Sequence, residues 1–281
     1  MRKVKLLGGE DIPILGLGTW LMGEFPSQFE REINAVRYAI ECGIRLIDTA
    51  EMYANGGAEK VVGEALKGLS GAQREDIFIV SKVLPSNAHF EGVIEACERS
   101  LCRLGVASID LYLLHWRGPS PFQETLDAFA ALQASGKIRY FGVSNFDASD
   151  MNEWYRCNGG GTLTTNQILY NLSRRGVEWD TIPLCKDRGV PVMAYSPLEQ
   201  GRLQDSLVLS RLAKRHGVAP LQIALAWVLA QENVITIPKA VNHEHIAQNI
   251  AALEITLDTD DHALLDANFA PPSGPSPLEI L

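Results

Sequence analysis

The sequence predicts an α/β fold, a single-domain (β/α)8 TIM barrel that takes in all of residues 1–281. Eight short β-branched or aliphatic segments alternate with amphipathic helical segments from one end of the chain to the other. Nearly continuous apolar strands separated by helices are typical of a parallel sheet covered by helices, and eight such units close a barrel. No low-complexity linker divides the chain, so we expect one domain.

The expected strands follow one another at regular spacing, with helical patterns between them. They are Ile14 to Trp20, Arg45 to Ala50, Ile77 to Val83, Ile109 to Trp116, Ile138 to Asn145, Leu163 to Tyr170, Pro191 to Leu198 and Val234 to Ala240. Between His89 and Leu104, apolar residues recur at steps of three and four, which predicts a helix with one buried face. A glycine precedes several strands (Gly43, Gly105, Gly136 and Gly189), where a preceding helix would end in a left-handed cap.

Additional elements are expected at three places. The opening VKLLGGEDIPILG reads as an N-terminal β-hairpin that would plug the floor of the barrel. The long interval before the last strand has room for an extra helix near 205–216, close to strands seven and eight, and another is expected at the C-terminus. A doubly wound open sheet is the main rival, but Gly16-Leu17-Gly18-Thr19 lacks the third glycine of a dinucleotide-binding G-x-G-x-x-G turn.

Charge and cysteine content narrow the class of protein. The chain has 25 Lys and Arg against 34 Asp and Glu, a net charge of −9, which argues against a nucleic-acid partner. The five cysteines have no metal-binding spacing, so we expect reduced thiols and no metal. No signal peptide and no membrane-spanning run is evident, so we expect a cytoplasmic protein without a membrane partner. A monomer is expected, and an oligomer stays open.

Polar and ionisable residues gather where the strands end, which is where barrels of this type place their active sites. Asp48 ends the second strand, Lys82 lies near the end of the third, and His115 ends the fourth. Each has a simpler explanation when taken alone: Asp48 could cap a helix, Lys82 could reach the rim, and His115 could be a hydrogen-bonded core residue. A lysine in an apolar strand is costly unless it is paired, so we expect Asp48 on the adjacent strand to pair with Lys82.

Seven motifs in register, of which IPKA at 237–240 is the last, resemble the aldo-keto reductase superfamily, and the resemblance covers nearly the whole chain from GLGTW at 16–20 onward. The others are DTAEMY, SKV, LLHW, GVSN, TNQ and AYSPL. The sequence TAEMYANGGAEKVVGEAL, the short loops and the C-terminal tail PPSGPSPLEIL resemble those of bacterial members of the methylglyoxal-reductase type.

The resemblance implies a reductase of small aldehydes or ketones whose catalytic residues are Asp48, Tyr53, Lys82 and His115. Tyr53 would be the general acid, and because the pKa of a free tyrosine is about 10, it would need a nearby cation, Lys82, to be competent near neutrality. His115 would orient the carbonyl oxygen. Packing is the simpler role for Tyr53, and plain core packing is an alternative for the expected pocket walls, which are Trp20, Met22 and Trp116 together with Tyr53 and His115.

The resemblance also implies a nicotinamide cofactor. The nicotinamide ring would stack on Tyr195, with Ser144, Asn145 and Gln167 at its carboxamide. Backbone donors would hold the pyrophosphate. The remaining expected contacts are Thr19, Trp20, Asp48, Ser196, Pro197, Leu198, Gln200, Gly201, Lys239, Ala240, Val241, Asn242, His245, Gln248 and Asn249. For Gln248 and Asn249, at the positions that meet the adenine, exposure on the last helix is an equal alternative.

One departure from the family pattern concerns the 2′-phosphate. Ala240 stands where NADPH-preferring members commonly have Ser, and His245 stands where Arg is usual. The two-pronged guanidinium contact is therefore lost. We expect NADPH to be favoured, with NADH as an alternative.

Two other functions are possible on the same fold. A cofactor-sensing subunit would have lost some of the four catalytic residues, and a lyase acting on a phosphorylated substrate would lack the Tyr and His pair. This chain keeps all four residues.

Overall fold

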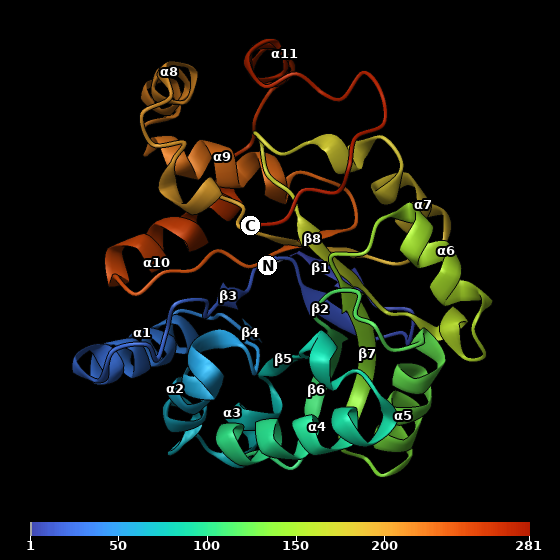
Figure 1. Ribbon diagram of the computed structural model, residues 1–281. Coiled ribbons are helices and arrows are strands. Elements are labelled where there is room, and N and C mark those ends of the chain that lie inside the picture. The colour runs from blue at the N-terminus through green and yellow to red at the C-terminus, as the bar shows by residue number, and fades with distance from the viewer. Residues whose placement is uncertain (1) are drawn as a thin grey trace.

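The computed structural model describes residues 2–281, and eight parallel strands surrounded by helices form its centre (Figure 1). The order of neighbours follows the chain, from β3 (Leu17–Gly18) through β4 (Leu46–Asp48), β5 (Phe78–Val83), β6 (Ile109–Leu114), β7 (Ile138–Ser144), β8 (Asn166–Leu169) and β9 (Val192–Tyr195) to β10 (Val234–Thr236). Each lies within a segment that the sequence predicts as a strand. The barrel fold class is therefore confirmed.

The first and last strands meet and close the barrel. Gly16 N–H donates to Thr236 O at 2.9 Å, Thr236 N–H donates to Ile14 O at 2.8 Å, and Gly18 forms a parallel bridge with Lys239. The approach is so close that a Cβ at Gly18 would lie 2.6 Å from Ile237 O. Only glycine fits there.

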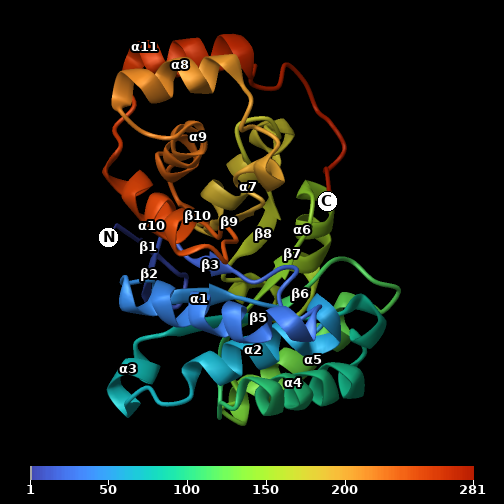
Figure 2. The same cartoon turned by 90° about the vertical axis from the view of Figure 1, so that its left-hand side faces the viewer.

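Helices cover the outside of the barrel (Figure 1). Those that follow the strands are α1 (Phe29–Glu41), α2 (Gly57–Leu66), α3 (Gly71–Glu75), α4 (Phe90–Leu104), α5 (Phe122–Ala134), α6 (Ala148–Arg156), α7 (Thr181–Asp187), α9 (Pro220–Leu229) and α10 (His243–Ala251). The extra helices expected beside strands seven and eight and at the C-terminus are α8 (Leu207–His216) and α11 (Thr259–Asn268), which lie together in Figure 2. Gly105, as expected, ends α4 in a left-handed cap with φ 65°.

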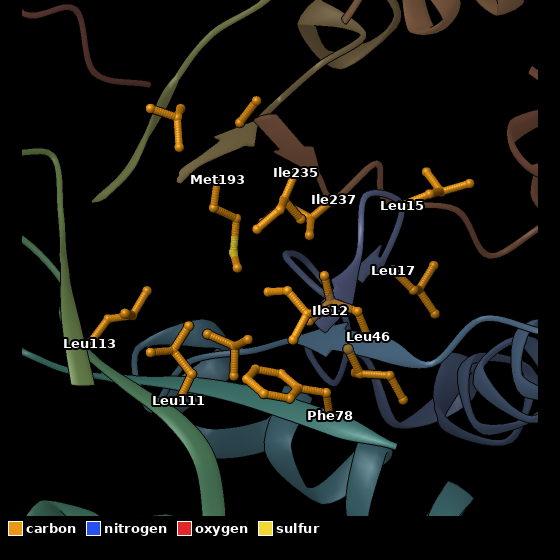
Figure 3. Packing of buried hydrophobic residues seen from close by; sticks show 14 of the residues in the cluster. Ile12, Leu15, Leu17, Leu46, Phe78, Leu111, Leu113, Met193, Ile235 and Ile237 are labelled. Carbon is orange, nitrogen blue, oxygen red and sulfur yellow. The ribbon is translucent and has the colours of Figure 1, made fainter. Parts of the chain in front are cut away.

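The N-terminal hairpin closes one end of the barrel. It pairs β1 (Lys3–Lys5) with β2 (Asp11–Pro13). Ile12 is 1% exposed, and Figure 3 shows it among core side chains of the barrel. The hairpin turn lies against the start of β7, where a Cβ at Gly8 would lie 2.3 Å from the ring of Tyr140. The predicted plug is confirmed.

Several strands end earlier than the sequence predicts, and each stop has a local cause. β7 ends at Ser144 because Asn145 has φ 56°, and β9 ends at Tyr195 because Ser196 has φ 48°. Residues in the left-handed region cannot continue a strand. The chain turns inward at these points and presents polar side chains at the mouth of the barrel, opposite the hairpin. Within residues 2–281, no helix is long and apolar enough to cross a membrane.

Candidate active site

A cavity of about 700 Å³ opens at the carboxyl ends of the strands. The C-terminal tail runs down the side of the molecule away from the hairpin (Figure 2), and the chain ends near the middle of the ring of strands in Figure 1. Most of the residues expected in a site line the cavity: Trp20, Asp48, Tyr53, His115, Trp116, Ser144, Asn145, Gln167, Tyr195, Ser196, Pro197, Leu198, Gln200, Gly201, Lys239, His245, Gln248 and Asn249. The barrel thus brings together side chains that are up to 229 positions apart, from Trp20 to Asn249.

Lys82 lies at the centre of the polar groups on the floor of the cavity. Its Nζ donates to Asp48 Oδ2 at 2.8 Å, to Thr49 O at 2.9 Å and to Tyr53 Oη at 3.1 Å. The pair expected from the sequence is therefore present, and it is buried: Lys82 is 0% and Asp48 2% exposed. All three ammonium protons have partners, so the cation is held at one point beside the Tyr53 hydroxyl.

Burial and charge act against each other in this cluster. Burial by itself would lower the pKa of Lys82, but Asp48 and Tyr53 outweigh it and raise that pKa above the ordinary value. Burial raises the pKa of Tyr53 above 10, and this effect exceeds the lowering by Lys82. Lys82 acts on this pKa in the expected direction, but burial has the larger effect. A raised pKa means that Tyr53 carries its proton at neutral pH.

His115 faces Tyr53 from the end of β6, with ring centroids 5.8 Å apart. Burial and then the Lys82 charge lower its pKa well below 6.5, so the imidazole is neutral at pH 7. Its Nδ1 is buried without a partner among residues 2–281. A neutral imidazole offers one N–H donor, which suits it to contact an oxygen beside the Tyr53 hydroxyl.

A second set of hydrogen-bonded polar side chains lines the wall formed at the ends of β7, β8 and β9. Tyr195 Oη donates to Asn145 Oδ1 at 2.9 Å, and Asn145 Nδ2 donates to His115 O at 3.1 Å. Burial raises the pKa of Tyr195 to about 12, so its ring stays neutral. Gln167 Nε2 donates to Asp48 Oδ1 at 2.8 Å, which leaves the amide oxygen of Gln167 for a ligand. The Oδ1 and Nδ2 atoms of Asn145 both have partners within the protein, and through Oδ1 this side chain orients Tyr195.

The loop after β9 has an unusual backbone. Three of its non-glycine residues have positive φ: Ser196 at 48°, Glu199 at 48° and Gln200 at 55°. Such a conformation costs about 1 to 2 kcal/mol per residue, so other contacts must hold it. Glu199 supplies them: it is 4% exposed, and its carboxylate accepts from Asn171, Arg174 and Arg202. The loop therefore presents backbone groups to the cavity in one fixed shape.

Six of the expected site residues are not among those that line the cavity, and the first is Lys82, which is fully buried behind Asp48 and Tyr53. Met22 is 0% exposed and lies in the hydrophobic core, so packing is its role and the expectation that it walls the pocket is wrong. Thr19 is also buried and donates from Oγ1 to Asp48 O at 3.0 Å. Ala240 and Val241 lie just past the cavity, and Asn242 caps α10 by accepting from Glu244 N–H at 2.8 Å.

The far end of the cavity is formed by β10 and α10. Lys239, His245, Gln248 and Asn249 line it. Partial burial lowers the pKa of Lys239 from its ordinary value, while Glu32 opposes that change. The α10 backbone is held from α9, because Gln222 Nε2 donates to Gln248 O at 2.9 Å. An elongated anionic ligand would reach from Tyr53 to Lys239.

The cavity also contains residues that the sequence reasoning missed. They are Gly18, Leu21, Met52, Gln204, Ala219, Leu221, Gln222, Ile237, Pro238, Ile280 and Leu281. Gly18, Leu21, Met52, Ile237 and Pro238 lie within two positions of predicted site residues in the chain. The remaining positions flank the extra helix α8 or belong to the tail, whose path no local pattern predicts.

Comparisons with known proteins agree with this geometry. The model of the aldo/keto reductase family matches residues 14–268. The chain is 48% identical to "Methylglyoxal reductase YeaE" of Escherichia coli K12, covering 100% of this chain and 99% of that protein. It is 36% identical to "Glyoxal reductase" of Bacillus subtilis, covering 99% and 97%. A crystal structure of an aldo-keto reductase from Klebsiella pneumoniae in complex with NADPH superimposes with a TM-score of 0.95 at 45% identity, covering 100% of this chain and 99% of that one.

Proposed function

The chain belongs to the aldo/keto reductase family, and from that premise we propose that it reduces small aldehydes and ketones with NADPH. Methylglyoxal and similar dicarbonyls are the substrates we favour, because relatives of 48% and 36% identity are described as methylglyoxal and glyoxal reductases. Simple aromatic aldehydes also suit the aromatic and aliphatic rim formed by Trp20, Met52 and Trp116.

The observation that carries this proposal is the hydroxyl of Tyr53, which lies 3.1 Å from a buried ammonium and beside a neutral imidazole. A bound nicotinamide supplies the hydride. Reduction turns the carbonyl oxygen into an alkoxide, which needs a proton donor and positive charge nearby. Tyr53 donates that proton, because an alkoxide is a stronger base than a phenolate even when burial raises the Tyr53 pKa. Lys82 stabilises the resulting phenolate, Asp48 fixes Lys82, and His115 donates to the same oxygen and orients it.

The shape of the cavity supports a dinucleotide. Tyr195 offers a flat ring near Tyr53, the Gln167 amide oxygen remains free to accept, and the loop at 196–201 offers backbone groups. Lys239, His245, Gln248 and Asn249 suit the adenosine end. We favour NADPH over NADH because Lys239 lies there and because the Klebsiella protein is a complex with NADPH. His245 and Ala240 make this preference weaker than in relatives with Arg and Ser. All five cysteines are free.

The direct test is the absorbance of NADPH at 340 nm with methylglyoxal and with benzaldehyde, repeated with NADH. We expect oxidation of NADPH with both carbonyls, and slower oxidation of NADH at equal concentration. If neither cofactor is oxidised with any small carbonyl although both bind, the chain senses cofactor and the proposal fails.

A further inference from the structure

Arg174, in the loop between β8 and α7, connects two segments that border the cavity from different sides. Its Nε and Nη2 both donate to Glu199 Oε1, at 3.1 and 2.8 Å. Its Nη1 donates to Glu279 Oε1 in the C-terminal tail. The side chain of Arg174 is 32% exposed, so water reaches it only in part. One guanidinium therefore holds two segments that are 80 positions apart in the chain (279 − 199).

The first segment is the loop at 196–201, where Ser196, Leu198, Gln200 and Gly201 line the cavity. Glu199 turns away from the cavity and accepts from Arg174, Arg202 and Asn171 Nδ2, the last at 2.8 Å. Asn171 Nδ2 also donates to Ser196 O at 2.9 Å. These contacts hold three residues with positive φ, so the shape of the loop depends on the charge of Glu199 and its partners.

The second segment is the tail after α11, which runs down the side away from the hairpin (Figure 2) and ends near the middle of the ring of strands (Figure 1). Its anchor is next to the β8–α7 loop: a Cβ at Gly176 would lie 2.5 Å from Ser276 Oγ, and Arg174 reaches Glu279. Directly after Glu279, Ile280 and Leu281 line the cavity. Tyr195 lines the same cavity. The ion pair thus fixes the point from which the tail enters the cavity.

We propose that Arg174 is a positioning residue that couples the dinucleotide loop to the tail, so that a bound cofactor fixes the tail over the carbonyl pocket. The inference rests on the proposed function, because it takes the loop at 196–201 to hold the pyrophosphate. A cofactor bound to this loop would stabilise the conformation in which Glu199 and the Arg174 fork are already formed, and would make their opening rarer. The remaining guanidinium nitrogen is then aimed at Glu279, and the apolar end of the tail is held beside Tyr195. No step of the reduction passes through Arg174 itself.

The test is hydrogen exchange of the tail amides at Ser273, Gly274, Ser276 and 278–281, with and without saturating NADPH. In the wild-type protein, NADPH is expected to slow exchange in the tail at least fivefold. In Glu279→Gln, the NADPH Kd should stay within twofold while the protection of the tail disappears. In Arg174→Gln, the protection should disappear and the NADPH Kd should rise about tenfold, because the loop loses its fork. Intrinsic tryptophan fluorescence gives both Kd values.

Steady-state kinetics provide a second readout, with Glu232→Gln as the matched control. Glu232 pairs with Lys186 at 2.7 Å on the outer surface, and neither residue lines the cavity, so Glu232→Gln removes a carboxylate from an ion pair that does not border the site. We expect Glu279→Gln to raise the KM for methylglyoxal three- to tenfold with kcat and the KM for NADPH unchanged, and Glu232→Gln to change none of them. Arg174→Lys should restore part of the tail protection, since it keeps the charge and loses the fork.

Two results would overturn the coupling. One is a tail whose exchange does not respond to NADPH in the wild-type protein although NADPH binds. The other is that all of the variants lose kcat to the same extent and lower the melting temperature to the same extent, with neither KM changed. A purely structural ion pair would give that result. Failure of the wild-type protein to bind NADPH or NADH at all would instead refute the proposed function, and the coupling with it.

Discussion

Replacement of Lys82 by Met is the perturbation that separates chemistry from packing most clearly. Methionine has a similar length and fits a side chain that is 0% exposed, but it removes the ammonium 3.1 Å from the Tyr53 hydroxyl. At that separation and an effective dielectric constant of about 20, a full phenolate gains roughly 5 kcal/mol from the cation, and a half-formed one roughly half as much. Each 1.36 kcal/mol is tenfold in rate, so kcat should fall by about 100-fold.

The pH dependence of kcat in Lys82→Met should also shift in a definite direction. Lys82 lowers the pKa of Tyr53, although burial dominates. Removal of the ammonium should therefore raise that pKa further, and the alkaline limb of the kcat profile, where Tyr53 loses its proton, should move to higher pH. The plateau below it falls at the same time.

A matched double variant excludes simple damage to the fold. Lys82→Met leaves Asp48 buried and unpaired, which should cost about 3 to 5 kcal/mol of unfolding free energy. Asp48→Asn with Lys82→Met removes both charges and should recover most of that stability in urea unfolding, while kcat stays low. The reasoning would be refuted if Lys82→Met kept kcat within threefold of the wild-type value, or if the double variant recovered activity together with stability.

Three further predictions concern the cofactor side. His245→Arg should lower the KM for NADPH severalfold and leave that for NADH unchanged, because a guanidinium can grip a phosphate with two donors; no effect on either would place the 2′-phosphate elsewhere. Tyr195→Ala should raise the NADPH KM about five- to tenfold, since stacking contributes about 1 kcal/mol, and an unchanged KM would contradict the stacking role. Burial alone would raise the pKa of Glu199, but donors from Arg174 and Asn171 outweigh it and lower that pKa. Its stabilising effect is therefore present above the unfolded pKa and lost as pH falls through the folded one, so the urea-unfolding difference between wild type and Glu199→Gln should shrink from pH 7 to pH 3; a constant difference would argue against it.

Periodicity was sufficient to predict the barrel, because each strand and helix has its own local signal. Gly105 and Gly189 lie at helix ends with positive φ. Glycine adopts positive φ without strain, so the residue type alone predicts such an end. The extent of the strands was less predictable. Asn145 and Ser196 leave the sheet through left-handed conformations, and contacts from elsewhere in the fold hold them there.

The site divides in the same way. The partner of Lys82 could be predicted from the sequence. A lysine in an apolar strand is buried and requires a counter-charge, and Asp48 lies on the adjacent strand. Arg174, Glu199 and Glu279 gave no such signal, since charged residues in loops are usually solvated. The order of the Tyr53 pKa effects was also beyond sequence reasoning, because burial depends on the complete packing around the hydroxyl.

The central claim is that Tyr53 supplies the proton, and Tyr53→Phe tests it most directly because the ring stays and only the hydroxyl is lost. The measurement is single-turnover oxidation of bound NADPH by methylglyoxal at pH 7, with the NADPH Kd determined in parallel by fluorescence. We predict an unchanged Kd and a hydride-transfer rate reduced by about 10²- to 10⁴-fold, the range that general acid catalysis contributes. An unchanged rate with an unchanged Kd would contradict the account.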